Sequence, residues 1–274
     1  MLARIIRFPN FRDKAVTLSY DDGVKQDIRL IEIMKKHGLK GTFNLGSGMC
    51  EATKNHLMKA DLYKTYAKSG MEVAVHGRGH LYLTAVDKTQ VVAEFLDDRR
   101  ELEKIFKTVI NGMAYPYGKY DEQTLCIIEN CGIKYARTTK STNGFELPEN
   151  WLEWHPTARH AAPELNELVD KFFAPADGNY WRQGVRVFYL WGHSYEFDND
   201  KNWNVIEEFC QRVGDRDDVW YATNGEIYEY VENAKRLEFS ADGRYVYNPG
   251  SQAIYIENFG RKAIAKPGKV TKIY

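Results

Sequence analysis

Short apolar runs alternate with amphipathic segments along most of this chain. The runs have the length of buried strands and lie at 15–18, 41–45, 71–75, 111–115, 133–137, 185–191 and 218–222. The segments between them have helical periodicity and lie at 27–37, 62–68, 89–107, 122–130, 163–173, 203–213 and 226–235. This alternation predicts a parallel sheet with helices outside it. A length of 274 residues best fits a closed or nearly closed barrel.

Two regions depart from this alternation. Residues 141–162 combine two Pro and two Trp residues with no clear period, and we expect them to form a long surface loop. From about residue 237 onward, short β-like runs are separated by Gly and Pro. About forty residues are few for an independent domain. We therefore expect residues 1–235 to form the barrel and residues 236–274 to form a β-rich extension packed on it.

Charge and hydropathy exclude several classes of partner. The formal net charge is zero, so the chain lacks the basic surface typical of proteins that bind nucleic acid or anionic membranes. No run approaches the roughly 18 apolar residues of a membrane span. The first nine residues lack the apolar segment of a secretory signal. We expect a cytoplasmic protein without nucleic-acid or membrane partners.

Two adjacent carboxylates, Asp21 and Asp22, follow the first strand and precede Gly23. Neighbouring carboxylates repel each other, so a half-buried pair needs a partner for its charge. One interpretation makes one Asp a metal ligand and the other a general base, which stays ionised beside a cation. The alternative is a turn in which an Asp caps the following helix.

His76 and His80 follow the third strand and are four residues apart. This separation lets two imidazoles face one ion if the intervening chain makes one helical turn. Two solvent-facing histidines in a Gly-containing loop are the alternative. Together with Asp22, the pair predicts a metal centre that leaves coordination positions open for water and substrate.

Two further motifs lie after strands. In the sequence Tyr115-Pro116-Tyr117-Gly118, the turn could aim a backbone N–H at a developing oxyanion, or it could simply connect a strand to a helix. His193 follows the strand at 185–191 and could donate a proton to a leaving group, or it could be structural. All these polar residues are predicted at the carboxyl ends of strands, the rim on which barrels build their sites.

The four motifs occur in the order and spacing of the polysaccharide deacetylase family, the NodB-homology domain, which residues 13–235 resemble. The resemblance implies a distorted (β/α) barrel of about seven parallel strands. It implies that one divalent metal ion, zinc or alternatively cobalt, nickel or manganese, is held by Asp22, His76 and His80. It further implies that Asp21 is the catalytic base, that His193 is the acid, and that the backbone N–H of Tyr117 helps to hold the oxyanion.

The chain departs from the family pattern at several places, beginning with a mild change, Ser19-Tyr20 where the family usually has Thr-Phe. Gly77 stands where many members carry Ser or Thr, which removes a hydroxyl that can brace the loop. Ala114 stands where members commonly have an Arg that orients the catalytic base. The replacement candidates are Arg78, Arg137 and Arg159. The family's Asp and Trp that support the acid have no clear counterpart here.

The resemblance predicts a hydrolase that removes an acetyl group from an N-acetylated or O-acetylated carbohydrate or sugar conjugate. The expected partner is therefore an acetylated carbohydrate or another small-molecule substrate. Two alternatives stay open: hydrolysis of a non-sugar amide by the same site, and a carbohydrate-binding relative that lost turnover with the missing Arg.

Overall fold

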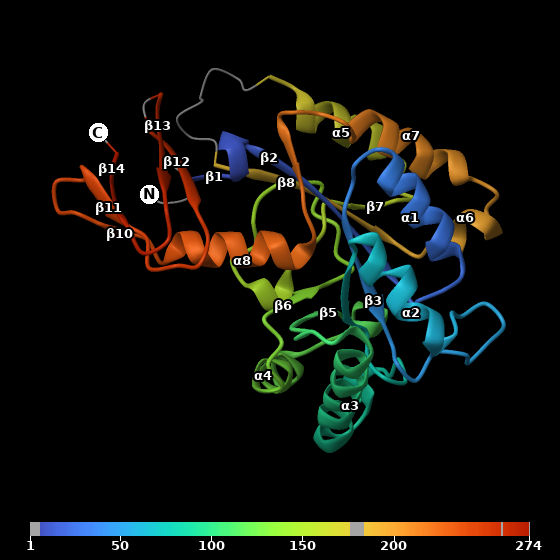
Figure 1. Ribbon diagram of the computed structural model, residues 1–274. Coiled ribbons are helices and arrows are strands. Elements are labelled where there is room, and N and C mark those ends of the chain that lie inside the picture. Colours follow the sequence, from blue (N-terminus) through green and yellow to red (C-terminus); the bar gives the residue numbers. More distant parts are fainter. Residues whose placement is uncertain (1–5, 176–183, 259, 274) are drawn as a thin grey trace.

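The computed structural model describes residues 6–175, 184–258 and 260–273. In this part of the chain, a parallel sheet of eight strands has the order β6-β5-β4-β3-β2-β8-β7, with β9 paired to β2 (Figure 1). The strands are β2 (Lys14–Asp21), β3 (Gly41–Leu45), β4 (Glu72–Val75), β5 (Gly112–Ala114), β6 (Tyr135–Arg137), β7 (Ala158–Arg159), β8 (Arg186–Gly192) and β9 (Val219–Tyr221). The predicted α/β barrel of about seven parallel strands is confirmed.

Strand β2 is the centre of the sheet, and all of it except Lys14 is buried. One of its edges pairs with β8 over nearly its whole length. The other edge is shared, since β9 pairs with its first half and β3 with its second half. Burial on both faces explains why β2 carries no charged residue between Lys14 and Asp21 at its two ends.

The surface loop expected at 141–162 is present at 141–150, but the expectation is wrong for 151–160, which are largely buried and pair with the sheet. Trp154 forms a parallel bridge with Arg137 of β6. A few residues later, β7 pairs with β8. The segment therefore connects β6, at one end of the sheet order, with β7 at the other end, and Trp154 is fully buried. No periodic sequence pattern predicts this pairing, because β7 has only two residues, too few to show a period.

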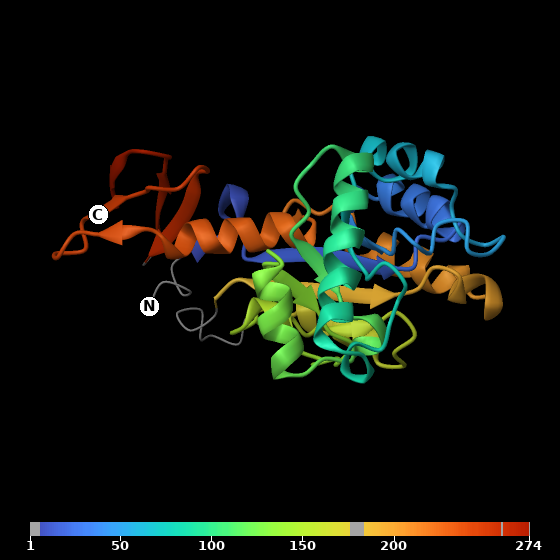
Figure 2. The same cartoon turned by 90° about the horizontal axis from the view of Figure 1, so that it is seen from below.

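Helices cover the outside of the sheet (Figures 1 and 2). They are α1 (Gln26–Lys36), α2 (Lys59–Thr65), α3 (Lys88–Phe106), α4 (Glu122–Asn130), α5 (Leu165–Phe173), α6 (Glu196–Asn199), α7 (Trp203–Val213) and α8 (Asn224–Lys235). The longest, α3, begins with a capping box in which Asp87 accepts bonds from the backbone N–H groups of Thr89 and Gln90. Among the described residues, no helix combines the length and apolar character needed to cross a lipid bilayer.

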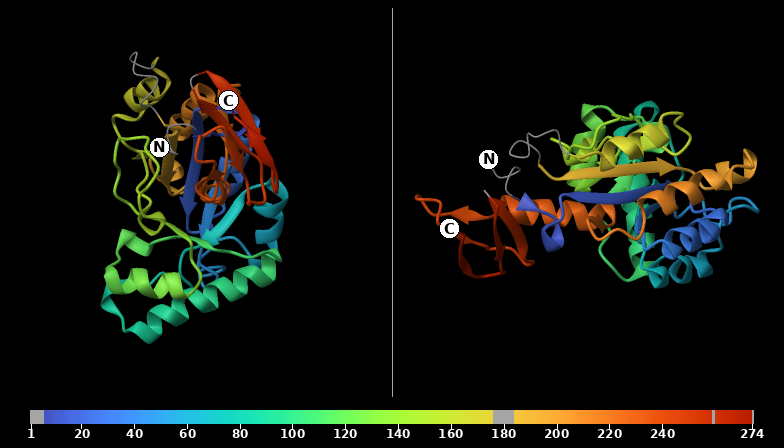
Figure 3. Two further views of the ribbon diagram at one scale, coloured as in Figure 1. Left: turned by 90° about the vertical axis from the view of Figure 1, so that its left-hand side faces the viewer. Right: turned by 90° about the horizontal axis from the view of Figure 1, so that it is seen from above.

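Strands after α8 form two small antiparallel sheets at one end of the molecule (Figure 3). One sheet has the order β10-β11-β14 and the other β1-β12-β13. Their bounds are β1 (Ile6–Arg7), β10 (Glu238–Phe239), β11 (Tyr245–Tyr247), β12 (Ile254–Asn258), β13 (Arg261–Ala265) and β14 (Val270–Lys272). Since β1 pairs with β12, the start of the described chain joins its C-terminal part. The division into residues 1–235 and 236–274 stays a prediction.

Candidate metal and acid–base site

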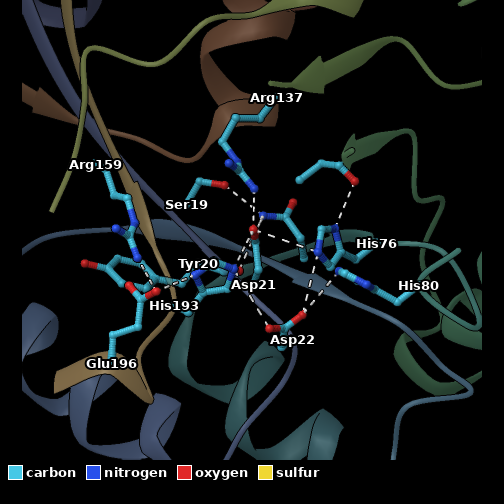
Figure 4. Close-up of polar contacts among 12 residues, drawn as sticks. Ser19, Tyr20, Asp21, Asp22, His76, His80, Arg137, Arg159, His193 and Glu196 are labelled. Atoms are coloured by element: carbon cyan, nitrogen blue, oxygen red, sulfur yellow. Dashed lines mark hydrogen bonds and ion pairs between the residues drawn. The ribbon is translucent and has the colours of Figure 1, made fainter. Parts of the chain in front are cut away.

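The carboxyl ends of β2, β4 and β8 meet at one rim of the barrel, and polar side chains converge there (Figure 4). Asp21 is the last residue of β2, His76 directly follows β4, and His193 directly follows β8. Parallel strands place their carboxyl ends on the same side of a sheet. The fold therefore brings together Asp21, Asp22, His76, His80 and His193, which lie up to 172 residues apart in sequence.

Asp22, His76 and His80 form a cluster in which one potential ligand atom from each lies within 4.8 Å of the others. The Asp22 Oδ1 atom lies 3.6 Å from His76 Nε2 and 3.9 Å from His80 Nε2. One carboxylate and two imidazoles are a donor set that suits zinc and similar divalent ions and leaves coordination positions open. The residues present thus fit the metal that the resemblance implies.

Backbone contacts and backbone geometry orient two of the three candidate ligands, His76 and Asp22. The Nδ1 atom of His76 lies 2.9 Å from the carbonyl oxygen of Ala114, so Nδ1–H donates and Nε2 remains free to bind a cation. Asp22 has a positive φ of 80°, and its N–H donates to the Asn44 carbonyl at 3.1 Å. This left-handed turn, which Asp tolerates better than most residues, separates the directions of the two adjacent carboxylates. Burial and the neighbouring His76 lower the pKa of His80, which favours the neutral imidazole that binds metal.

Asp21 is almost completely buried and is held by two residues from other strands. Arg137 of β6 donates to its Oδ2 atom, and Asn44 of β3 donates to its Oδ1 atom at 2.8 Å. Burial by itself raises the pKa of this carboxyl group, but Arg137 and then His76 outweigh it, so the pKa lies below its ordinary value. Asp21 is consequently ionised at neutral pH.

The structure also shows which arginine faces Asp21. Arg137 is buried and stacks on the ring of Trp191, with its guanidinium carbon 4.4 Å from the ring centroid. Of the other two candidates, Arg78 pairs with Asp97 and Arg159 pairs with Glu196. The guanidinium absent at position 114 is therefore supplied by the neighbouring strand, because β5 and β6 end at the same rim.

His193 lies next to the carboxylate of Glu196, one helical turn further along the chain. The Nδ1 atom of His193 is 3.2 Å from Glu196 Oε1, and its Nε2 atom is 3.8 Å from Asp21 Oδ2. Burial lowers the pKa of His193, but Glu196 and then Asp21 outweigh it and raise the pKa above its ordinary value. Glu196 also contacts Arg159 and lies 3.0 Å from His160 Nε2. These partners hold its pKa below the ordinary value, so it stays negative beside His193.

Tyr117 lies beside the metal-ligand cluster, in a turn with unusual backbone angles. It has a φ of 56°, and Gly118 has a φ of 65°. A Cβ atom at Gly118 would lie 2.0 Å from Thr139 Oγ1, so this turn requires glycine. The ring of Tyr117 packs edge-on against His80 and stacks on the ring of Tyr82 with 3.8 Å between ring centroids. The predicted role of its backbone N–H stays a prediction.

Sequence reasoning missed two residues that contact the predicted site. Asn44 lies near the carboxyl end of β3, so the same rule that selected the other rim residues could have found it. Glu196 follows His193 by three residues, which is the spacing of one helical turn. The segment between β6 and α5 contributes His160, which contacts Glu196.

Comparison with known proteins relates part of this barrel to a family. The model of the family described as "Polysaccharide deacetylase" matches residues 9–136, just under half of the chain. The matched region contains Asp21, Asp22, His76, His80 and Tyr117, and it ends before Arg137 and His193.

Two curated relatives are similar to about half of the chain. The Bacillus subtilis protein YxkH, provisionally named a polysaccharide deacetylase, is 28% identical over 130 residues, which are 47% of this chain and 46% of YxkH. Chitin deacetylase 1 of Cryptococcus neoformans is 26% identical over 141 residues, which are 50% of this chain and 28% of that protein. The chain thus spans less than half the length of either relative.

Solved structures extend the likeness in fold beyond the matched region. A Mycobacterium smegmatis protein provisionally named a polysaccharide deacetylase has a TM-score of 0.63 at 17% identity, covering 84% of this chain and 94% of that chain. A family 4 carbohydrate esterase from Streptomyces lividans, solved with acetate, has a TM-score of 0.50 at 14% identity, covering 74% and 88%. At these identities the likeness concerns the fold alone.

Proposed function

We propose that this protein is a metal-dependent hydrolase that removes an acetyl group from an acetylated carbohydrate or sugar conjugate. The family match, the name of the chitin deacetylase relative and the acetate-bound carbohydrate esterase support this substrate class. The single observation that carries the proposal is Asp21, a buried ionised carboxylate that lies between an arginine and the candidate metal ligands.

Asp22, His76 and His80 would hold the metal ion. A bound divalent cation is a Lewis acid that polarises the scissile carbonyl and acidifies water, and zinc is our first choice for this donor set. Asp21 would take the proton from the attacking water. Its low pKa keeps it ionised and able to accept, and Arg137 and Asn44 fix both of its oxygen atoms.

His193, whose Nε2 atom lies 3.8 Å from Asp21 Oδ2, would act as the acid that protonates the leaving group. Its raised pKa increases the protonated fraction near neutral pH, so it can give a proton to the departing amine or alkoxide as the carbon–nitrogen or carbon–oxygen bond breaks. Glu196 accepts from Nδ1 and thereby directs Nε2 toward the reacting atoms. The backbone N–H of Tyr117 would donate to the developing oxyanion.

A non-catalytic carbohydrate-binding role is the second candidate. One related fold is a pseudoenzyme of carbohydrate esterase family 4 from Bacillus anthracis, with a TM-score of 0.50 at 16% identity. The sequence argument for this role was the missing arginine at position 114. The contact between Arg137 and Asp21 removes that argument, because the base has an orienting guanidinium from another strand.

Acetate release from N-acetylated chito-oligosaccharides and O-acetylated xylo-oligosaccharides tests the proposal. We expect release by the zinc-loaded protein, loss of release after chelation, and recovery when zinc or cobalt is returned. Asp21→Asn should lower kcat about a thousandfold, within the range that a general base contributes. Asp170→Asn, a change in a surface pair with Arg212, is the matched control and should leave kcat unchanged.

Oligosaccharide binding without acetate release, under saturating zinc or cobalt, would support the non-catalytic role. Release from a panel of non-sugar amides, with none from acetylated sugars, would support the other hydrolase alternative. Release that survives in the metal-free protein or in Asp21→Asn would contradict the mechanism.

A further inference from the structure

The loop that carries the two histidine ligands is attached to one acidic residue of α3, Glu94. This side chain is buried, with 6% of its surface exposed. Its Oε1 atom accepts the backbone N–H of Gly79 at 2.8 Å and that of Leu81 at 3.2 Å. Its backbone carbonyl accepts the N–H of Arg78 at 3.1 Å. One residue thus holds three N–H groups of a six-residue loop, residues 76–81, which we call the metal loop.

The backbone of the metal loop needs such support. Gly77 and His80 both have positive φ angles, 81° and 55°. For His80 this conformation is disfavoured, since its Cβ crowds the backbone, and it persists only when surrounding contacts hold it. The two N–H groups that bind Glu94 Oε1 belong to the residues on either side of His80. The carboxylate therefore fixes the peptide units that orient the His80 ring.

Glu94 also explains the glycine at position 77. A Cβ atom built on Gly77 would lie 2.8 Å from Glu94 Oε1 and 3.3 Å from its Cγ atom. A residue with a Cβ atom at position 77 would require the Glu94 carboxylate to shift. The small residue and the buried acid are thus two parts of one arrangement, in which an acceptor from α3 occupies the space beside the loop.

We propose that Glu94 is a positioning residue that holds the metal loop in the shape in which His76 and His80 bind the same cation. It acts through acceptor geometry, since one oxygen atom receives two N–H groups. This inference rests on the proposed metal centre. Residues that orient metal ligands typically change metal affinity by about 10- to 100-fold when they are removed.

Zinc affinity of the purified protein, measured by competition with a chromophoric chelator, tests the inference without relying on turnover. Glu94→Ala should bind zinc about 10- to 100-fold more weakly than the unmodified protein and should change the visible spectrum of bound cobalt. Glu94→Gln keeps an acceptor oxygen, so it should retain affinity within about threefold of the unmodified protein. Zinc binding by the unmodified protein tests the metal centre itself.

Glu103→Ala is the matched control. Glu103 is a carboxylate of the same helix that accepts the N–H of Ile110 at 3.0 Å and bonds Arg99, far along α3 from the metal loop. The thermal midpoints of the metal-free variants report general damage to the helix. Similar midpoints for Glu94→Ala and Glu103→Ala, with zinc affinity lost only in the former, would support the inference.

Two results would overturn it. Unchanged zinc affinity and cobalt spectrum in Glu94→Ala would show that the loop keeps its shape without the carboxylate. Equal weakening in Glu94→Gln and Glu94→Ala would show that charge, and not acceptor geometry, is responsible. If the unmodified protein bound no zinc, the proposed metal centre would fail together with this inference, whereas the two results above leave the metal centre intact.

Discussion

The two halves of the candidate site differ in where their residues come from. The metal half consists of Asp22, His76 and His80, all within the region that matches the family model. The acid–base half depends on contacts of Asp21 with Arg137 and of His193 with Glu196. Three of these four residues lie after the end of the matched region.

This difference indicates how the two halves tolerate change. A metal ligand must present a particular atom at a particular place, so Asp and His cannot be moved elsewhere without rebuilding the site. A supporting charge only needs to reach its partner. The arginine that faces Asp21 comes from β6, although the family pattern suggests β5, because both strands end at the same rim.

His76→Ala should have the largest effect. It removes a metal ligand, and a cation that polarises a carbonyl contributes several kcal/mol, so acetate release should fall at least about a thousandfold. Metal content and acetate release measured on the same sample check this. His56→Ala is the control, since His56 contacts Thr53 in a partly exposed turn. Substantial turnover by a metal-free His76→Ala protein would contradict the assignment of the metal half.

Arg137→Ala should lower kcat/KM about a hundredfold while leaving zinc bound, since it removes support for a general base. Arg137 holds the pKa of Asp21 down, so its removal should raise that pKa. A base works only when ionised, so the acid limb of the kcat/KM profile should move to higher pH. Arg29→Ala is the matched control, because the guanidinium carbon of Arg29 also lies over a tryptophan ring, 4.2 Å from the centroid of Trp203. An unmoved acid limb would count against Arg137 as the orienting group.

Glu196→Gln should have a smaller effect, about tenfold on kcat, as one charge next to the acid is lost. Glu196 helps to raise the pKa of His193, so the variant should have a lower His193 pKa. An acid works only when protonated, so the alkaline limb should move to lower pH. Asp198→Asn, on the same short helix and bonded to Trp203, is the control. A shift of the limb in the opposite direction would exclude His193 as the acid supported by Glu196.

Tyr82→Ala should have the smallest effect, about threefold on kcat/KM, the order of a lost aromatic pair. Tyr82 and Tyr117 are about half exposed and stack on each other beside His80. We expect this loss to appear as a higher KM with kcat unchanged, because the Tyr82 ring lies next to the metal half and does not contact the acid–base pair. Tyr63→Ala, another exposed ring, is the control. An effect confined to kcat would show that Tyr82 acts by holding the Tyr117 turn.

The order of strands and helices followed from the sequence wherever elements were long enough to show a period. The ranges at 41–45, 122–130 and 203–213 agree with β3, α4 and α7 to the residue. Short elements have no detectable period, so the two-residue strand β7 lies within a range predicted as loop. The pairing of β1 with β12 joins residues about 250 positions apart and has no local signal.

For the site, the sequence alone supplied the residues whose chemistry is fixed by type and spacing: two adjacent carboxylates, two histidines four apart and a histidine after a strand. Which charges face them depends on the folded sheet. Arg137 was one of three candidates, and it contacts Asp21 because the curled sheet brings the end of β6 close to the end of β2, although three strands lie between them in the sheet order. Ligand types are set by local chemistry, whereas electrostatic partners are set by which strand ends meet in space.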